Sequence, residues 1–342
     1  MSWNCRSWKI VRSQASHAAL ACAMMSVAAL IATPVSAQEK KGEGVTVCIS
    51  LDKTSSPSRD GQLKLWRAYA EEQGVKLIEQ VAGEDAQRQS SQVDTCIAQG
   101  VSGIISIPWD AEAVLQDIER AHAANIPFAT IDQAPVDMST VDFHTGADPQ
   151  ADGMNAAKRL ISIVGDKPTK VVVLQGALSH FNGKMRDAGF KEGIKDYPNI
   201  TIVSEIPTEW RPEPVLAGME NALQANPDLG AVYVPSDGLL PPVWSALKKV
   251  NRYTKTGEDN HVVVLSIDGD PQGCLSVQNG VMDAGYAQPF ADMTRATIDA
   301  IISIAKDGKK FEGDERVLMI PGTEYTPENI ATVADKVWGC AK

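Results

Sequence analysis

The sequence has no long apolar run after residue 32, no cluster of basic residues and no closely spaced cysteines. Because a bilayer span needs about 20 apolar residues, this part of the chain is expected to be soluble. A formal net charge of −11 without a basic cluster argues against binding to nucleic acid or anionic lipid. No histidine stands at ligand spacing from a cysteine, which argues against zinc.

The chain also lacks the short motifs of common enzyme classes. It contains no Gly-x-Ser-x-Gly elbow and no His-Glu-x-x-His site. The segment from Gly176 to Lys184 ends like a P-loop, but six residues rather than four separate its glycines. Asp268–Gly273 begins like a calcium loop, but Gln272 stands at a ligand position. We predict a binding protein rather than an enzyme, with no cofactor and no metal.

The first 37 residues have the pattern of a secretory signal peptide. Arg6, Lys9 and Arg12 precede an uncharged apolar run at 18–32, and small residues precede Gln38. The alternative, a membrane anchor, needs a longer run of about 20 residues. We predict cleavage before Gln38. Removing three basic residues and no acidic ones leaves a mature chain with a formal net charge of about −14.

Four cysteines remain in the mature chain: Cys48, Cys96, Cys274 and Cys340. An even number in an oxidising compartment is compatible with two disulfides. Cys48 lies in the first predicted strand and Cys96 in the second predicted helix, so they could meet where that helix packs on the sheet. Cys274 and Cys340 would form the other pair. Four buried thiols are the alternative, and the sequence leaves both open.

Short apolar runs rich in β-branched residues alternate with segments of helical period. The runs predict strands at 45–51, 75–81, 103–107, 127–131, 170–174, 200–205, 231–234, 262–267 and 284–287. In the segment 111–124, Val114, Leu115 and Ile118 form one apolar stripe. This alternation predicts an α/β fold of doubly wound parallel sheets, with strands buried on both faces.

The strand and helix pattern occurs twice, which predicts two similar lobes. A helix at 290–306 and a strand at 317–320 follow the second set and are expected to return to the first. We therefore predict an N-terminal lobe of residues 38–145 plus 289–318 and a C-terminal lobe of 146–288 plus 319–342. Several crossings between lobes make a hinge, and no low-complexity linker separates them.

Polar residues gather after the predicted strands, where open parallel sheets bind ligands. These segments are 52–59, 109–110, 132–133, 180–186, 236–237 and 268–270. Two such rims that face each other across a hinge would form a cleft. Trp109 could close over a ligand there or pack within the fold, and the sequence leaves both readings open.

Several segments in this order resemble the periplasmic sugar-binding proteins of ABC importers, in particular the ribose-binding branch of the type I fold. They are Gly100–Pro108 before Asp110, Asn125–Asp132, Leu174–Gly176 before Arg186 and Gly189–Phe190, Ala231–Asp237, Ser266–Gly269 before Pro271, and Ala287–Gln288. The resemblance covers essentially the whole mature chain. It implies ligand contacts at Ser56, Ser58, Arg59, Asp132, Gln133, Lys184, Trp210, Ser236, Asp237, Asp268 and Gln288, with Arg186 as scaffold.

These residue types suit a hydroxylated ligand. The carboxylates of Asp132 and Asp268 can accept hydroxyl protons, and Lys184 can donate. Trp210 would lie against the apolar face of a sugar ring. A neutral sugar or polyol is therefore the expected ligand. Arg59 and Lys184 suggest a sugar acid as the alternative, although Arg59 alone reads as a solvated loop end.

The resemblance implies an extracytoplasmic solute-binding protein that captures its ligand by hinge closure in the periplasm. The protein would be a monomer and would deliver the ligand to an ABC permease in the inner membrane. A second expectation is ligand presentation to a chemoreceptor or sensor kinase. A transcriptional repressor of similar fold is excluded, because the secretion signal occupies the place of a DNA-reading headpiece.

Overall fold

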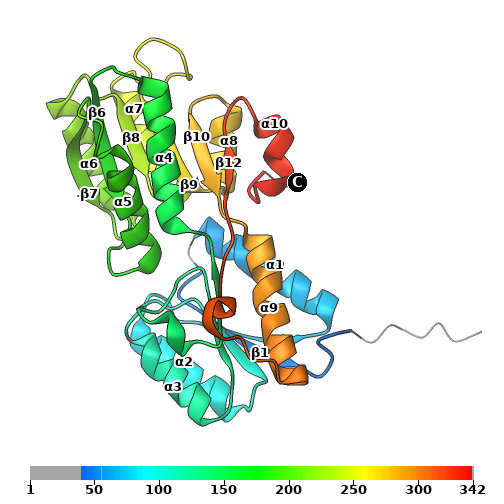
Figure 1. Ribbon diagram of the computed structural model, residues 1–342. Coiled ribbons are helices and arrows are strands. Elements are labelled where there is room, and N and C mark those ends of the chain that lie inside the picture. The colour runs from blue at the N-terminus through cyan, green and yellow to red at the C-terminus, as the bar shows by residue number, and fades with distance from the viewer. Residues whose placement is uncertain (1–39, 55, 341–342) are drawn as a thin grey trace, which may run out of the picture. The chain divides into compact units, whose positions relative to one another are not determined.

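The computed structural model of the protein describes residues 40–54 and 56–340. The predicted signal peptide, residues 1–37, lies outside the described residues. The described chain forms two α/β lobes, each built on a six-stranded sheet (Figure 1). Among the described residues, no helix combines the length and the apolar character needed to cross a bilayer.

The N-terminal lobe contains a parallel sheet and helices on both of its faces. Its elements are β1 (Thr46–Leu51), α1 (Pro57–Gln73), β2 (Lys76–Val81), α2 (Ala86–Ala98), β3 (Gly103–Ser106), α3 (Val114–Ala123), β4 (Phe128–Ile131), β5 (Phe143–Gly146), α9 (Phe290–Asp307) and β11 (Val317–Met319). The strands follow the order β11-β5-β4-β3-β1-β2. All the pairings in this sheet are parallel.

The C-terminal lobe repeats this plan. Its elements are α4 (Pro149–Val164), β6 (Thr169–Gln175), α5 (Phe181–Ile194), β7 (Ile200–Pro207), α6 (Pro212–Ala225), β8 (Ala231–Val234), α7 (Leu240–Lys249), β9 (Val263–Asp268), α8 (Pro271–Gln278), β10 (Ala284–Ala287), β12 (Thr323–Tyr325) and α10 (Ile330–Val333). The strand order is β12-β10-β9-β8-β6-β7.

Two features depart from the expected all-parallel, fully buried sheets. β12 pairs with β10 in the antiparallel sense, because the chain returns to the second sheet directly from β11 without a crossover helix. The edge strands β2 and β7 are only partly buried. Strands at an edge have a neighbour on one side only, so part of their surface faces water.

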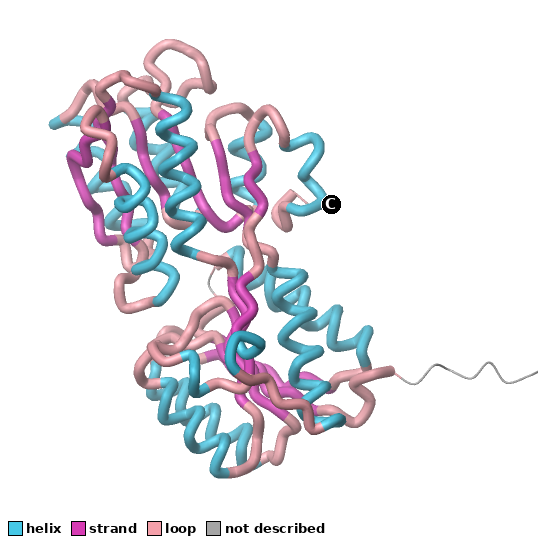
Figure 2. Tube along the Cα trace, viewed as in Figure 1, coloured by secondary structure: helices cyan, strands magenta, loops and turns pink. Residues whose placement is uncertain are grey.

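Alternating side chains divide each sheet between two cores. In β1, Val47 and Ile49 pack with residues of α1 and α9, whereas Cys48 packs with residues of α2 and α3. In β6, Val171 packs with α4 and α5, and Val172 packs with α6 and α7. This period of two buries both faces of the sheet, as a doubly wound fold requires. Figure 2 shows the strands enclosed between helices in this way.

Short sequence signals start several helices at the carboxyl ends of strands. Asp148 caps α4 and Asp270 caps α8, and a proline follows each cap at the first helical position. Ser56 caps α1 in the same manner, with its Oγ accepting from the backbone N–H of Arg59. A polar cap satisfies an orphan N–H group, and proline is preorganised for the first turn. These caps therefore fix where the chain leaves the strand ends.

The chain crosses between the lobes after β5, after β10 and after β11. The segment after residue 290 returns to the N-terminal sheet and core, since α9 packs in that core and β11 pairs with β5. Three connecting segments of this kind can act as a hinge, so that one lobe rotates against the other with little change inside each lobe.

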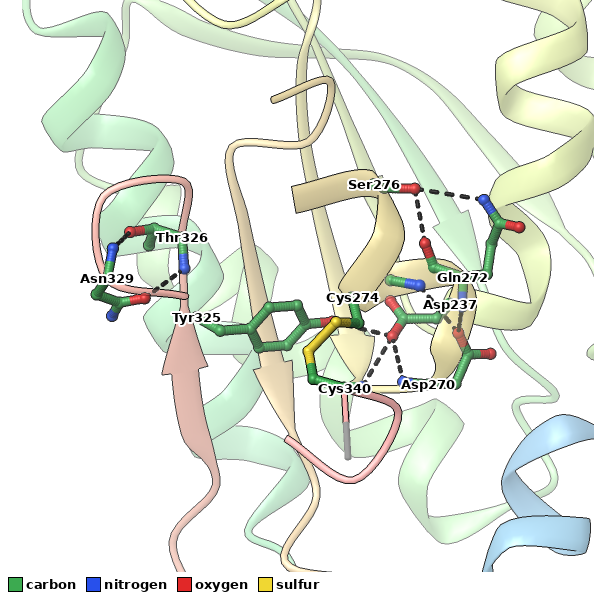
Figure 3. The surroundings of a disulfide bond; sticks show 11 residues. Asp237, Asp270, Gln272, Cys274, Ser276, Tyr325, Thr326, Asn329 and Cys340 are labelled. Atoms are coloured by element: carbon green, nitrogen blue, oxygen red, sulfur yellow. Dashed lines mark hydrogen bonds between the residues drawn. A yellow bond between two sulfur atoms is a disulfide. The ribbon is translucent and has the colours of Figure 1, made fainter. Parts of the chain in front are cut away.

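Of the two alternatives that the sequence left open, the structure shows two disulfides, and each lies within one lobe. Cys48 of β1 is bonded to Cys96 of α2, with their Cα atoms 6.1 Å apart. Cys274 of α8 is bonded to Cys340, with their Cα atoms 5.4 Å apart. Figure 3 shows the second disulfide beside Tyr325. It ties the end of the described chain to the C-terminal core.

Candidate ligand-binding site

A pocket lies where the carboxyl ends of strands from both lobes meet. Its cavity volume is about 210 Å³. This volume lies below the range of about 300–1,000 Å³ that is common for drug-sized ligands, so the pocket suits a small solute. Most of the sequence-predicted contacts line it: Ser56, Ser58, Arg59, Asp132, Gln133, Trp210, Ser236, Asp268 and Gln288.

Arg59 organises the N-terminal side of the pocket. Its Nε and Nη2 donate to the two carboxylate oxygens of Asp52 at 2.8 and 2.9 Å, and its Nη1 donates to Asp132 Oδ2 at 2.5 Å. Burial alone would lower the pKa of Arg59, but the two carboxylates raise it above its ordinary value. Arg59 is thus buried and paired, and its interpretation as a solvated loop end is wrong.

The two central aspartates of the pocket adopt unusual backbone conformations. Asp132 has a φ of 67° and Asp268 a φ of 118°. Around Asp132, the Gln133 N–H donates to Ile131 O at 2.8 Å and closes a three-residue turn. Non-glycine residues with positive φ cost about 1–3 kcal/mol and persist only where the surroundings enforce them. Their presence at both strand ends makes this pocket the candidate functional site.

Asp268 organises the C-terminal side. Its Oδ2 accepts from Ser236 Oγ at 2.5 Å, and its Oδ1 accepts from Gln288 Nε2 at 2.6 Å. The guanidinium of Arg186 lies 3.1 Å from the same Oδ1 and also donates to Pro235 O at 2.8 Å. Burial opposes the charge of Arg186, but Asp268 outweighs it and the pKa of Arg186 is raised. This side of the pocket is a second buried ion pair.

Some polar atoms of this network have no protein partner among the described residues. They are Nε and Nη2 of Arg186 and Oε1 of Gln288. A buried polar group without a partner costs about 1–3 kcal/mol. Both residues line the pocket, so a polar ligand can satisfy these atoms.

Trp210 forms an aromatic wall, and its ring is held in place from two directions. Its Nε1 donates to His180 Nδ1 at 2.9 Å. Gly176 leaves the space that the ring fills, since a Cβ there would lie 2.2 Å from the Trp210 ring. Burial lowers the pKa of His180, so the imidazole is neutral near pH 7 and can accept this bond.

Asn182, at the start of α5, links the lobes beside the pocket. Its side-chain amide donates to Asp132 Oδ1 at 2.7 Å, and its backbone N–H donates to Gln133 Oε1 at 3.2 Å. Asn182 therefore orients two N-terminal pocket residues from the opposite lobe.

Residues 47–310 match a family model described as a periplasmic binding protein domain. The match spans more than half of the chain. The chain belongs to the periplasmic binding protein family. Members of this family bind solutes and are not enzymes, so the prediction of a binding protein is confirmed.

Relatives and solved structures agree with this assignment. The ribose import binding protein RbsB of Bacillus subtilis is 28% identical over 243 residues, which are 71% of this chain and 76% of that protein. The crystal structure of a galactofuranose binding protein has a TM-score of 0.78 at 26% identity and covers 86% of this chain and 98% of its own. The arabinose-transporter component from Shewanella sp. ANA-3, bound to α- and β-L-arabinofuranose, has a TM-score of 0.77 at 25% identity, with 84% and 93% coverage. The type I fold is confirmed.

Lys184 was expected to contact the ligand, but in this periplasmic binding protein it is exposed and does not line the pocket. Successive helical residues are about 100° apart around the axis, so Asn182 and Arg186, four apart, share one face of α5. Lys184, two residues from each, points to the opposite side. Arg186, which was expected to be scaffold, takes the pocket position instead.

Asp237 is buried behind the pocket and does not line it. Its Oδ2 accepts from the backbone N–H groups of Gly269 and Asp270 at 2.8 and 2.9 Å and from Tyr325 Oη at 3.0 Å. Figure 3 shows this cluster beside the disulfide. Burial raises the pKa of Asp237 well above its usual value. Its contacts support the loop after Asp268, which is a structural role.

Trp109 also lies outside the pocket lining. Its ring meets that of His180 edge-on, with centroids 4.6 Å apart, and Lys53 Nζ lies 5.7 Å from its centroid. Trp109 therefore packs behind a pocket residue of the opposite lobe rather than in the ligand space.

The prediction of individual contacts missed Asp52, His180, Asn182 and Arg186, all of which line the pocket. The segments 52–59 and 180–186 were recognised as polar rims. The missing signal was the spacing of four residues between Asn182 and Arg186, which places two polar side chains on one helical face.

The charges of the pocket neutralise one another. Each cationic side chain that lines it pairs with a carboxylate: Arg59 with Asp52 and Asp132, Arg186 with Asp268, and Lys53 with Glu84. No cation is left in excess among the lining residues.

Proposed function

We propose that the protein captures a neutral sugar or polyol in this pocket and delivers it to an ABC import permease. The observation that supports this most strongly is the pair of buried carboxylates, Asp132 and Asp268, which reach one pocket from opposite lobes. The similar proteins described above are named for, or were solved with, pentoses and hexoses: ribose, galactofuranose and arabinofuranose.

The hydrogen bonds within the site leave a defined capacity for ligand hydroxyls. A carboxylate offers about four acceptor positions. Asp132 uses one for Asn182 and one for Arg59, which leaves about two. Asp268 accepts two hydrogen bonds, from Ser236 and Gln288, and the ion-paired guanidinium of Arg186 occupies a third position, which leaves about one. Asp132 is therefore expected to accept from two hydroxyls and Asp268 from one.

The ligand would complete the polar network while Trp210 supplies contact area. The free Nε and Nη2 of Arg186 are donors for ligand oxygens, and the free Oε1 of Gln288 is an acceptor. Bonds to charged groups contribute about 1.5–3 kcal/mol each, so three or four of them, about 4.5–12 kcal/mol together, offset most of an association cost of about 4–15 kcal/mol. Trp210 covers an apolar C–H face of the sugar.

Hinge closure is the proposed mechanism. A ligand that contacts both lobes favours the closed form by its differential binding free energy. Shifting the population from 1:99 to 99:1 takes about 5.5 kcal/mol, which two or three charge-assisted bonds from the second lobe can supply. The permease would then recognise the closed form.

We propose residues 38–145 plus 289–318 and 146–288 plus 319–342 as the lobes, with crossings next to β5, β10 and β11. Sheet membership supports these boundaries, since β11 pairs in the first sheet and β12 in the second. The signal-peptide pattern at residues 1–37 and the family support periplasmic residence. We propose a monomer there; presentation of ligand to a chemoreceptor or sensor kinase is compatible with the same site.

The test is a ligand screen on the mature protein. Mass spectrometry of co-purified small molecules and a thermal-shift screen of sugars, polyols and sugar acids would be followed by calorimetry. We expect a neutral compound to bind more tightly than its corresponding acid, because the pocket has no unpaired cation. Preference for the acid would refute the assignment of a neutral ligand, and turnover of the bound compound would refute a binding role.

A further inference from the structure

The last described residues, Val337–Cys340, form a segment that touches both lobes, and we call it the C-terminal strap. We propose that the strap fixes how the lobes meet and that Trp338 positions Asp268 for ligand binding. The effect on affinity rests on the proposed function, whereas the effect on lobe geometry does not.

The strap is anchored in the C-terminal lobe by three independent contacts. Cys340 is bonded to Cys274 of α8, as Figure 3 shows. Val337 is fully buried in the core formed by α6, α7 and α8. The Gly339 N–H donates to Gly269 O at 2.8 Å, next to the pocket aspartate.

Trp338 points the other way, into the N-terminal lobe. Its ring packs against the core formed by α1 and α9, with its centroid 5.4 Å from that of Phe290. Gly61 of α1 provides the room, because a Cβ there would lie 2.7 Å from Trp338 Cζ3. Adjacent strap residues thus pack with the cores of different lobes.

Trp338 also touches the ligand site through the backbone. Its Nε1 donates to Asp268 O at 2.7 Å. Asp268 has a strained φ of 118°, and such a conformation persists only where neighbouring contacts enforce it. The helix α1 that receives the ring begins at the pocket and carries Arg59. One side chain therefore joins the pocket residues of the two lobes behind the ligand space.

The geometric part is tested without any ligand. Spin labels on Glu119→Cys of α3 and Lys158→Cys of α4, both exposed, would report the distance between the lobes by pulsed electron paramagnetic resonance. We expect Trp338→Ala to broaden or shift this distribution. The variant with Cys274→Ser and Cys340→Ser should do the same to a smaller extent, because Val337 still anchors the strap.

Trp244→Phe is the matched control. Trp244 is buried within the C-terminal core alone, and its Nε1 has no partner among the described residues. Its substitution should leave the distance distribution unchanged. A folded Trp338→Ala protein with the wild-type distribution would overturn the proposal, and so would equal changes in both tryptophan variants, since these indicate general loosening.

The positioning part is tested with Trp338→Phe, which keeps a ring but removes the N–H donor. With the sugar that binds the wild-type protein, the dissociation constant should rise about two- to tenfold, the effect of one hydrogen bond. The distance distribution should remain near that of the wild type. An unchanged dissociation constant would refute the role of the bond to Asp268, whereas absence of any binding sugar for the wild type would refute only the proposed function.

Discussion

Replacing Asp268 with Asn removes a charge from the pocket with little change in shape. The amide oxygen can still accept from Gln288 Nε2 and face the guanidinium of Arg186, and the Ser236 hydroxyl can rotate to accept from the new NH₂ group. The site should therefore stay assembled. The substitution removes the one acceptor position that the carboxylate has left for a ligand hydroxyl.

The expected loss follows from that single bond. A hydrogen bond to a charged group contributes about 1.5–3 kcal/mol, which corresponds to a rise of about 10- to 150-fold in the dissociation constant. Stability should fall by about 1–3 kcal/mol, because Arg186 keeps a hydrogen bond but loses its counter-charge. Asp268→Ala should cost about 3–5 kcal/mol of stability, since it leaves the buried guanidinium unpaired, and should abolish detectable binding.

Calorimetry with the identified sugar measures the affinity, and thermal melts followed by circular dichroism measure the stability. Asp228→Asn is the control, because Asp228 is an exposed carboxylate of the same lobe, paired with Lys170 at the surface. It should change neither quantity appreciably. A dissociation constant for Asp268→Asn within threefold of the wild type would refute the assignment of Asp268 as a ligand contact.

Further substitutions separate the pocket from its surroundings. Lys184→Ala should leave the dissociation constant unchanged in calorimetry, and a tenfold loss of affinity would show that Lys184 contacts the ligand. Gly176→Ala should displace the Trp210 ring, weaken binding and reduce any ligand-induced change in tryptophan fluorescence; wild-type affinity would contradict the proposed wall. Burial raises the pKa of Asp152 to about 7, with Arg186 opposing the shift. Between about pH 4 and 7 the carboxyl of Asp152 is therefore protonated in the folded state and ionised in the unfolded state. As the pH rises through this window, the free energy of unfolding falls by up to about 4 kcal/mol. Asp152→Asn should flatten this dependence in denaturant titrations, and a persistent slope would contradict the assignment.

The architecture was largely predictable because apolar runs of regular spacing determine buried strands. The runs at 231–234 and 284–287 coincide with β8 and β10. β5 was missed because Phe143–Gly146 contains a histidine and a glycine and shows no β-branched run. β12 was missed because it has only three residues and pairs at an edge, where the hydrophobic pattern is weak.

The sequence predicted which loops form the site, but it did not predict every residue that lines it. Asp132 and Asp268 could be placed because they end apolar strands, and such ends face the ligand region. Lys184 and Arg186 were exchanged because only the rotation of α5 decides which of them faces the pocket. The partnership of Arg59 with Asp52 and Asp132 depends on side chains from different loops, so no local pattern reveals it.

The interleaving of α9 and β11 with the first lobe has a consequence for biogenesis. Residues 290–319 complete the core and the sheet edge of a lobe whose other strands, β1 to β5, lie within residues 46–146. A nascent chain that emerges from its amino end cannot finish this lobe until the second has been made. The N-terminal lobe therefore stays incompletely folded during most of the synthesis of the polypeptide.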